Sequence, residues 1–160
     1  MAATRGHRAE RRLPATLAGL AVLGFAVSSY LASFQLGLIG AVWDPFFATG
    51  SERVLTSTVS RLLPVPDATL GTAAYAADAI IAVALALRPD APAWLPGLLA
   101  LVATSGAIVG LVLVVLQPLV AESLCTLCLV SAGLATTLAV GAAIELRARL
   151  EADLPRLDPH

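Results

Sequence analysis

The chain has 160 residues, of which 58% are hydrophobic and 13% charged, and its formal net charge is −1. An average soluble domain is about 45–50% apolar and about 25% charged, so this composition excludes an ordinary soluble globular domain. The small net charge and the lack of a large basic patch exclude nucleic acid as a partner. The apolar residues come in long runs, which predicts helices in lipid, where each backbone polar group must be paired within its own segment.

The first apolar run extends from Leu13 to Gly40 and follows a basic N-terminal segment. A secretory signal peptide has an apolar core of about 7–15 residues, whereas a helix needs about 20 residues to cross a bilayer. The length of the run therefore predicts a retained transmembrane helix. Four arginines precede it: Arg5, Arg8, Arg11 and Arg12.

The segment that follows, residues 41–69, is too polar to cross a membrane and too long for a tight turn. Pro64 and Pro66 interrupt it before the next apolar run. Its larger apolar residues predict a short helix that lies across one end of the bundle: Phe46, Phe47, Val54 and Leu55.

Three further apolar runs cover Leu70–Leu87, Trp94–Leu116 and Ser123–Leu146. Each is about as long as a helix must be to cross the hydrocarbon core of a bilayer. The sequence therefore predicts an all-α integral membrane protein, a four-transmembrane-helix bundle with a short interfacial helix in the first outer loop.

The basic residues predict the orientation, because cytoplasmic segments are enriched in Lys and Arg. All ten are Arg, which is typical of a GC-rich bacterial genome. The side that holds both termini carries the N-terminal arginines, Arg88 and three in the tail, whereas the other side carries only Arg53 and Arg61. We expect a multi-pass protein of a bacterial inner (plasma) membrane with both termini in the cytoplasm. The expected divisions are a cytoplasmic basic N-terminus (1–12), a four-helix membrane domain (13–146) and a cytoplasmic polar tail (147–160).

Cys125 and Cys128 are the only two cysteines, and both lie at the predicted outer start of the last span. Residues three apart share one face of a helix, and the positive end of the helix dipole favours a thiolate. The outer compartment also permits disulfides, so a redox pair is the favoured interpretation over two small buried apolar residues. A zinc site is not expected, because His7 and His160 lie on the other side of the membrane.

Asp78 lies within the second span, where a carboxylate is costly and is by default a functional hypothesis. In one interpretation it is neutral or occupies a polar cavity with hydroxyl groups of other spans. In the other, the second span starts late and Asp78 meets water or a neighbouring subunit. The hydroxyl groups in question belong to Ser28, Ser29, Thr104 and Ser105.

The chain resembles the vitamin K epoxide reductase family, which includes bacterial quinone-linked disulfide-forming enzymes. The resemblance extends from Tyr30 through the fourth span. Its motifs are Ser51–Ser57 in the loop, the Pro66–Gly71 turn, Tyr75 near the start of the second span, and the Cys125–Cys128 pair.

By this resemblance the cysteine pair is the catalytic centre beside a quinone, ubiquinone or menaquinone, held inside the bundle. Cys125 would exchange disulfides with an external thioredoxin-like thiol protein, and Cys128 would pass electrons to the quinone. Ser57 corresponds to a loop hydroxyl residue near the quinone, Asp67 to an Asn that hydrogen-bonds a quinone carbonyl, and Tyr75 completes the implied quinone site.

The sequence departs from the family pattern at several positions. Trp43 and Ser51 occupy the places of a loop cysteine pair that relays electrons, and Ala132 occupies that of an aromatic hydroxyl. Asp67 replaces the Asn and, when ionised, can only accept hydrogen bonds. Two interpretations follow: an oxidoreductase in which Cys125 meets its partner directly, or a non-catalytic accessory subunit that packs in a larger membrane protein complex.

Overall fold

The computed structural model describes residues 3–58, 60, 65–88, 90–92 and 94–153. Pro64 and the tail from residue 154 onward, both part of the sequence predictions, lie outside this range. The described residues form helices and loops without a strand. The helices are α1 (Ala3–Gln35), α2 (Gly50–Leu55), α3 (Asp67–Leu87), α4 (Trp94–Leu116), a π-helical turn η2 (Gln117–Ala121) and α5 (Thr126–Asp153).

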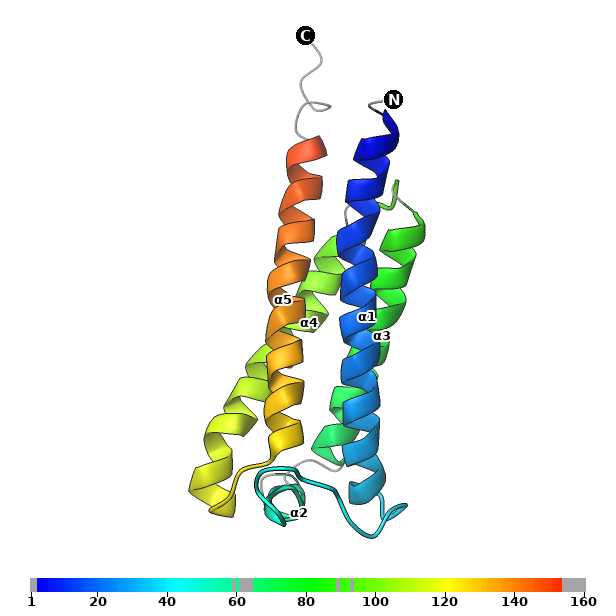
Figure 1. The fold of residues 1–160 in the computed structure, drawn as a ribbon. Coiled ribbons are helices and arrows are strands. Elements are labelled where there is room, and N and C mark those ends of the chain that lie inside the picture. Colours follow the sequence, from blue (N-terminus) through cyan, green and yellow to red (C-terminus); the bar gives the residue numbers. More distant parts are fainter. Residues whose placement is uncertain (1–2, 59, 61–64, 89, 93, 154–160) are drawn as a thin grey trace.

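Four of these helices form a bundle, with α2 across one end and the start of α1 and the end of α5 at the other (Figure 1). Each of the four contains a segment long and apolar enough to cross a membrane: Arg12–Gln35, Asp67–Leu87, Trp94–Ala121 and Thr126–Ala152. The predicted all-α bundle of four transmembrane helices is confirmed, and the protein is a multi-pass membrane protein.

Helix packing relies on small residues at the contacts. Helix α1 packs along α3 and α4 along α5, and contacts between α1 and α5 and between α3 and α4 close the bundle. Alanines such as Ala21, Ala82 and Ala142 are fully buried and allow the close approach that favours association of helices in lipid. Large aliphatic side chains such as Ile80 and Leu101 are exposed instead, as expected of a surface that faces lipid.

The first span ends at Gln35, five residues before the predicted boundary at Gly40. Gly37 adopts a φ of +73°, a conformation that side chains disfavour and that commonly terminates a helix. The Leu38 N–H donates to the Ser33 carbonyl at 2.8 Å, which completes the terminal turn. The residues after Gly37 therefore leave the helix axis and start the loop that carries α2.

The predicted short helix in this loop is present as α2 (Figure 1). Val54 and Leu55 are buried, whereas Phe46 and Phe47 lie in the preceding turn and are exposed. A Cβ at Gly50 would overlap the carbonyl oxygen of Leu124, just before α5. Glycine at this position therefore allows α2 to lie directly against the start of the last span.

Helix α4 ends at Leu116, as predicted, and the span continues through Pro118 as the π-helical turn η2. Proline lacks a backbone N–H and cannot continue the regular helix hydrogen-bond pattern, so the widened turn accommodates it. Glu122 then adopts a left-handed φ of 49° and reverses the chain toward α5. This geometry directs the buried side chain of Gln117 toward the start of α5, where its Oε1 accepts a hydrogen bond from the Cys125 N–H at 3.1 Å.

Candidate active site

Cys125 and Cys128 form a disulfide, as their spacing predicts, with their Cα atoms 5.2 Å apart. Helix α5 begins at Thr126, so Cys125 immediately precedes the helix and Cys128 lies in its first turn. The Cys128 N–H points at the Cys125 Sγ at 3.1 Å, and the Leu129 N–H donates to the Cys125 carbonyl at 3.0 Å. The helix start therefore holds both sulfurs in the geometry of the pair.

Asp44 joins the loop to this helix start. Its pKa would be raised by burial, but hydrogen bonds to the carboxylate outweigh that effect and lower the pKa well below the ordinary value. The donors are the Ser51 hydroxyl, the N–H and hydroxyl of Thr126, and the N–H groups of Phe46 and Phe47. Because Thr126 is the first residue of α5 and Ser51 belongs to α2, the carboxylate ties the loop to α5.

Ser51 covers the Cys125 sulfur. Its Oγ lies 2.7 Å from Asp44 Oδ2 and 3.2 Å from Cys125 Sγ. A hydroxyl has one proton to donate, and the shorter contact to a charged acceptor is the stronger bond, so the proton points to Asp44. Ser51 and Cys125 are both fully buried, and an external thiol can reach the Cys125 sulfur only if α2 moves aside.

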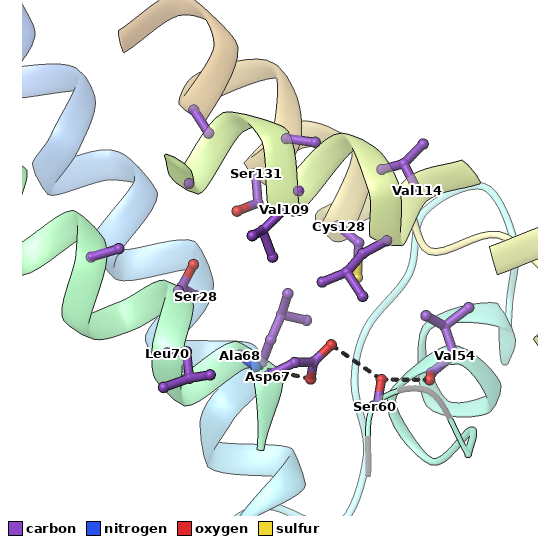
Figure 2. A pocket seen from close by; sticks show the side chains of 18 of the residues that line it. Ser28, Val54, Ser60, Asp67, Ala68, Leu70, Val109, Val114, Cys128 and Ser131 are labelled. Carbon is purple, nitrogen blue, oxygen red and sulfur yellow. Dashed lines mark hydrogen bonds between the residues drawn. The ribbon is translucent and has the colours of Figure 1, made fainter. Parts of the chain in front are cut away.

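A cavity of about 400 Å³ lies inside the bundle, bounded by all the helices. Cys128 contributes to its wall, and Figure 2 shows Asp67 and Ser60 across the cavity from Cys128. Cys125 does not line it. Ligand pockets have volumes of about 300–1,000 Å³ and are mostly apolar with a few polar groups, and this cavity has that character. Its walls bring together Cys128 and the predicted quinone-site residues Ser57, Asp67 and Tyr75.

The sequence model of the vitamin K epoxide reductase family matches residues 15–143. The chain belongs to this family. Searches of curated proteins and of solved structures found no match. Membership of the vitamin K epoxide reductase family, together with the Cys125–Cys128 disulfide, indicates a membrane thiol–disulfide oxidoreductase.

Vitamin K epoxide reductases generally use a quinone as electron acceptor, and the cavity fits such a group by its size and its largely apolar wall. Ser57 is half-buried and lines the cavity just after α2. Asp67, where the family resemblance implies an Asn, already accepts hydrogen bonds from the Gln35 side chain at 2.5 Å and from the Ser60 hydroxyl at 3.2 Å. Asp67 thus serves as an acceptor that ties α3 to α1 and the loop.

Tyr75 forms part of the cavity wall. Its hydroxyl donates to the Ser131 carbonyl at 2.5 Å, which joins α3 to α5. A Cβ at Gly24 would overlap its ring, so the ring lies directly against α1. The hydroxyl proton of Tyr75 is engaged by the protein, and the ring supplies an apolar surface.

Three polar residues of the candidate site were not predicted from the sequence. Gln35 bridges Leu55, Asp67 and Ala68, and Gln117 holds the backbone of Cys125. Ser60 bonds both Asp67 and the Val54 carbonyl. Gln35 is the last residue of α1 and Gln117 directly follows α4, and an amide side chain next to a long apolar run is the signal that could have marked them.

Proposed function

We propose that this protein passes electrons from an external thiol protein, through Cys125 and Cys128, to a membrane quinone such as ubiquinone or menaquinone. The observation that carries the proposal is the division of the disulfide between two environments. Cys128 lies in the wall of the bundle cavity, whereas Cys125 lies outside it beneath α2. This division supports a route in which Cys128 serves a ligand in the cavity and Cys125 serves a partner that approaches from the loop side.

The exchange step is attack by a partner thiolate on the Cys125 sulfur. The bond between Cys125 and Cys128 breaks, and Cys128 leaves as a thiolate. A second thiol of the partner then attacks the mixed disulfide, which releases an oxidised partner and leaves Cys125 and Cys128 as a dithiol. A bound quinone supplies the acceptor for the two electrons and two protons that must leave the dithiol when the disulfide reforms.

The residues proposed to hold the quinone are Ser57, Asp67 and Tyr75. Ser57 supplies a hydroxyl in the lining of the cavity, and Tyr75 supplies an aromatic wall. Asp67 keeps the loop and the start of α3 in place through its bonds to Gln35 and Ser60. In this proposal Asp67 positions the loop, whereas the Asn implied by the family resemblance would itself donate a hydrogen bond to the quinone.

The proposed partner is a thioredoxin-like protein of the extracytoplasmic compartment, the side on which the arginine distribution predicts the cysteine pair. Trp43 and Ser51 cannot relay electrons as loop cysteines would. The partner must then meet Cys125 directly, which requires the Asp44–Ser51 contact to open. This need for opening is the part of the proposal that is specific to this chain.

The test uses a thioredoxin with one remaining active-site cysteine, activated as its mixed disulfide with thionitrobenzoate. With Cys128→Ser, the Cys125 thiolate should displace thionitrobenzoate and form a stable mixed disulfide with the thioredoxin. Cys125→Ser is the matched control and should release much less thionitrobenzoate, because the remaining thiol, Cys128, faces the cavity. In the wild type, reduced protein should regain its disulfide when a short-chain ubiquinone is added under nitrogen.

A non-catalytic accessory subunit is the second candidate, and the full burial of Cys125 beneath Ser51 favours it. In that case neither single variant captures the thioredoxin, and added quinone does not restore the disulfide. The variant with both cysteines changed to Ser would still co-purify with the same membrane subunits as the wild type. That combination of results would reject the oxidoreductase proposal.

A further inference from the structure

Asp78 is a buried carboxyl group that the proposed electron path does not use. It lies on α3, is only 3% exposed and lines the same cavity as Cys128. Its Oδ1 has no hydrogen-bond partner among the described residues. The structure thus places Asp78 inside the bundle cavity, the first of the two settings considered for it from the sequence.

The surroundings of Asp78 favour a carboxyl group that keeps its proton. Small residues of the facing helices, Ala103, Gly106 and Ala135, line the cavity with it. A charged carboxylate without a partner is strongly disfavoured in such a setting. The neutral carboxyl group, in contrast, carries one O–H that can be donated to a ligand.

Two other polar side chains of the cavity are already used by the protein, whereas the hydroxyl groups of Ser28 and Ser57 can donate a hydrogen bond but are too weakly acidic to give up a proton. Asp67 accepts from Gln35 and Ser60, and the Tyr75 hydroxyl donates to the Ser131 carbonyl. Ala132, where the family resemblance implies an aromatic hydroxyl, has no donor in its side chain. Quinone oxygens accept hydrogen bonds, and buried acceptors left without a donor are costly. Reduction of a quinone also requires a proton donor, and the protonated carboxyl group of Asp78 can supply that proton.

We propose that Asp78 is the proton donor to the quinone in this cavity, an inference that rests on the proposed function. Oxidation of the two thiols to the disulfide releases two electrons and two protons. The O–H bond of Asp78 breaks, and its proton goes to a quinone oxygen. The carboxylate then takes up one thiol proton, and the other thiol proton completes the second hydroxyl. The sum is dithiol plus quinone giving disulfide plus quinol, with Asp78 unchanged.

The test compares wild type with Asp78→Asn, which keeps the size of the side chain and an N–H donor but has no acidic proton. Short-chain ubiquinone is the probe, and its dissociation constant with the oxidised protein should stay within about threefold of wild type. Quinol formation by the reduced protein should slow by about 100-fold, the usual loss when a general acid is removed. Asp78→Glu should restore part of the rate.

Infrared difference spectra give a readout that does not depend on turnover. Binding of ubiquinone to the oxidised wild type should shift the carbonyl stretching band of a protonated carboxyl group, and Asp78→Asn should lack that band. Asp90→Asn makes the same chemical change at an exposed acid outside the cavity, and it should leave the rate, the affinity and the band unchanged.

Three results would overturn the assignment: an unchanged rate in Asp78→Asn, a loss of affinity that accounts for the whole loss of rate, or a band unaffected by ubiquinone. If the wild type itself forms no quinol, the proposed function fails instead. The infrared band then decides separately whether Asp78 donates its hydrogen to the bound quinone.

Discussion

The Ser51 hydroxyl lies 3.2 Å from the Cys125 sulfur, and its proton points to the Asp44 carboxylate at 2.7 Å. A serine thus stands in contact with the first cysteine of the disulfide, at a position where the family resemblance implies a loop cysteine. The hydroxyl holds the loop against α5 but cannot exchange with the disulfide. Ser51 thus occupies the place from which a loop cysteine would exchange with the Cys125–Cys128 disulfide.

The contact predicts that Ser51→Cys creates a third thiol within reach of Cys125. Its thiolate should attack Cys125, which forms a disulfide between positions 51 and 125 and leaves Cys128 free. Alkylation without reduction, followed by peptide mass mapping, should find the label on Cys128 in a substantial fraction of molecules. The wild type should take up label only after reduction.

Thr49→Cys is the matched control, because Thr49 is an exposed residue of the same loop. Its label should appear on position 49 alone, with the Cys125–Cys128 disulfide intact. If the label in Ser51→Cys is found on position 51 and not on Cys128, the close approach of the loop to Cys125 is wrong.

Asp44 should stabilise the folded protein in a pH-dependent manner. Its pKa is lowered in the folded state, so its contribution is present above the ordinary Asp value of about 3.9 and is lost as the pH falls through the folded pKa. Asp44→Asn should lower the unfolding free energy near pH 7 by about 2 kcal/mol.

Thermal unfolding in detergent from about pH 7 down to about pH 2, through and below the ordinary Asp pKa of about 3.9, checks this expectation. The difference in melting temperature between wild type and Asp44→Asn should shrink toward low pH. Asp90→Asn removes an exposed acid and should show no such difference. A constant gap across the range would mean that the ionised carboxylate is not the stabilising group.

The fit of Tyr75 against α1 predicts opposite effects of two alanine substitutions on that helix. A Cβ at Gly24 would overlap the Tyr75 ring, whereas a Cβ at Gly19 meets nothing within 4 Å. Gly24→Ala should destabilise the protein by about 1–3 kcal/mol through overpacking. Gly19→Ala should be neutral or stabilising by up to about 1 kcal/mol, because alanine favours helix.

Unfolding midpoints of the two variants in the same detergent give the comparison. Gly24→Ala should also weaken binding of short-chain ubiquinone, since Tyr75 lines the cavity. Equal midpoints for the two variants would show that the ring is free to move away from α1.

The distribution of arginines predicts the orientation in the membrane. A green fluorescent protein fused after Asp153, the end of α5, should fluoresce in the cytoplasm. An alkaline phosphatase inserted beside Thr49 should be active, because that enzyme needs the oxidising outer compartment. The reverse pattern would put the cysteine pair in a reducing compartment and contradict the proposed function.

The sequence by itself determined the elements that depend on neighbouring residues. The lengths of the apolar runs gave four spans, and a separation of three residues at a helix start gave the Cys125–Cys128 disulfide. The end of the first span was misjudged because hydropathy does not detect the backbone conformation of Gly37. Lipid selects helices by the hydropathy and length of consecutive residues, so these features can be read along the chain.

Only the tertiary structure decided which distant polar groups meet. Asp44 bonds Thr126 across 82 positions, and Gln35 bonds Asp67 across 32. The burial of Cys125 beneath Ser51 and the place of Asp78 in the cavity are of the same kind. Hydropathy predicts that a segment forms a helix in lipid. It does not predict the rotation of that helix about its axis or its shift along the axis relative to neighbouring helices. Those two quantities are fixed by the packing of small side chains between helices, and they determine which polar groups come within bonding distance.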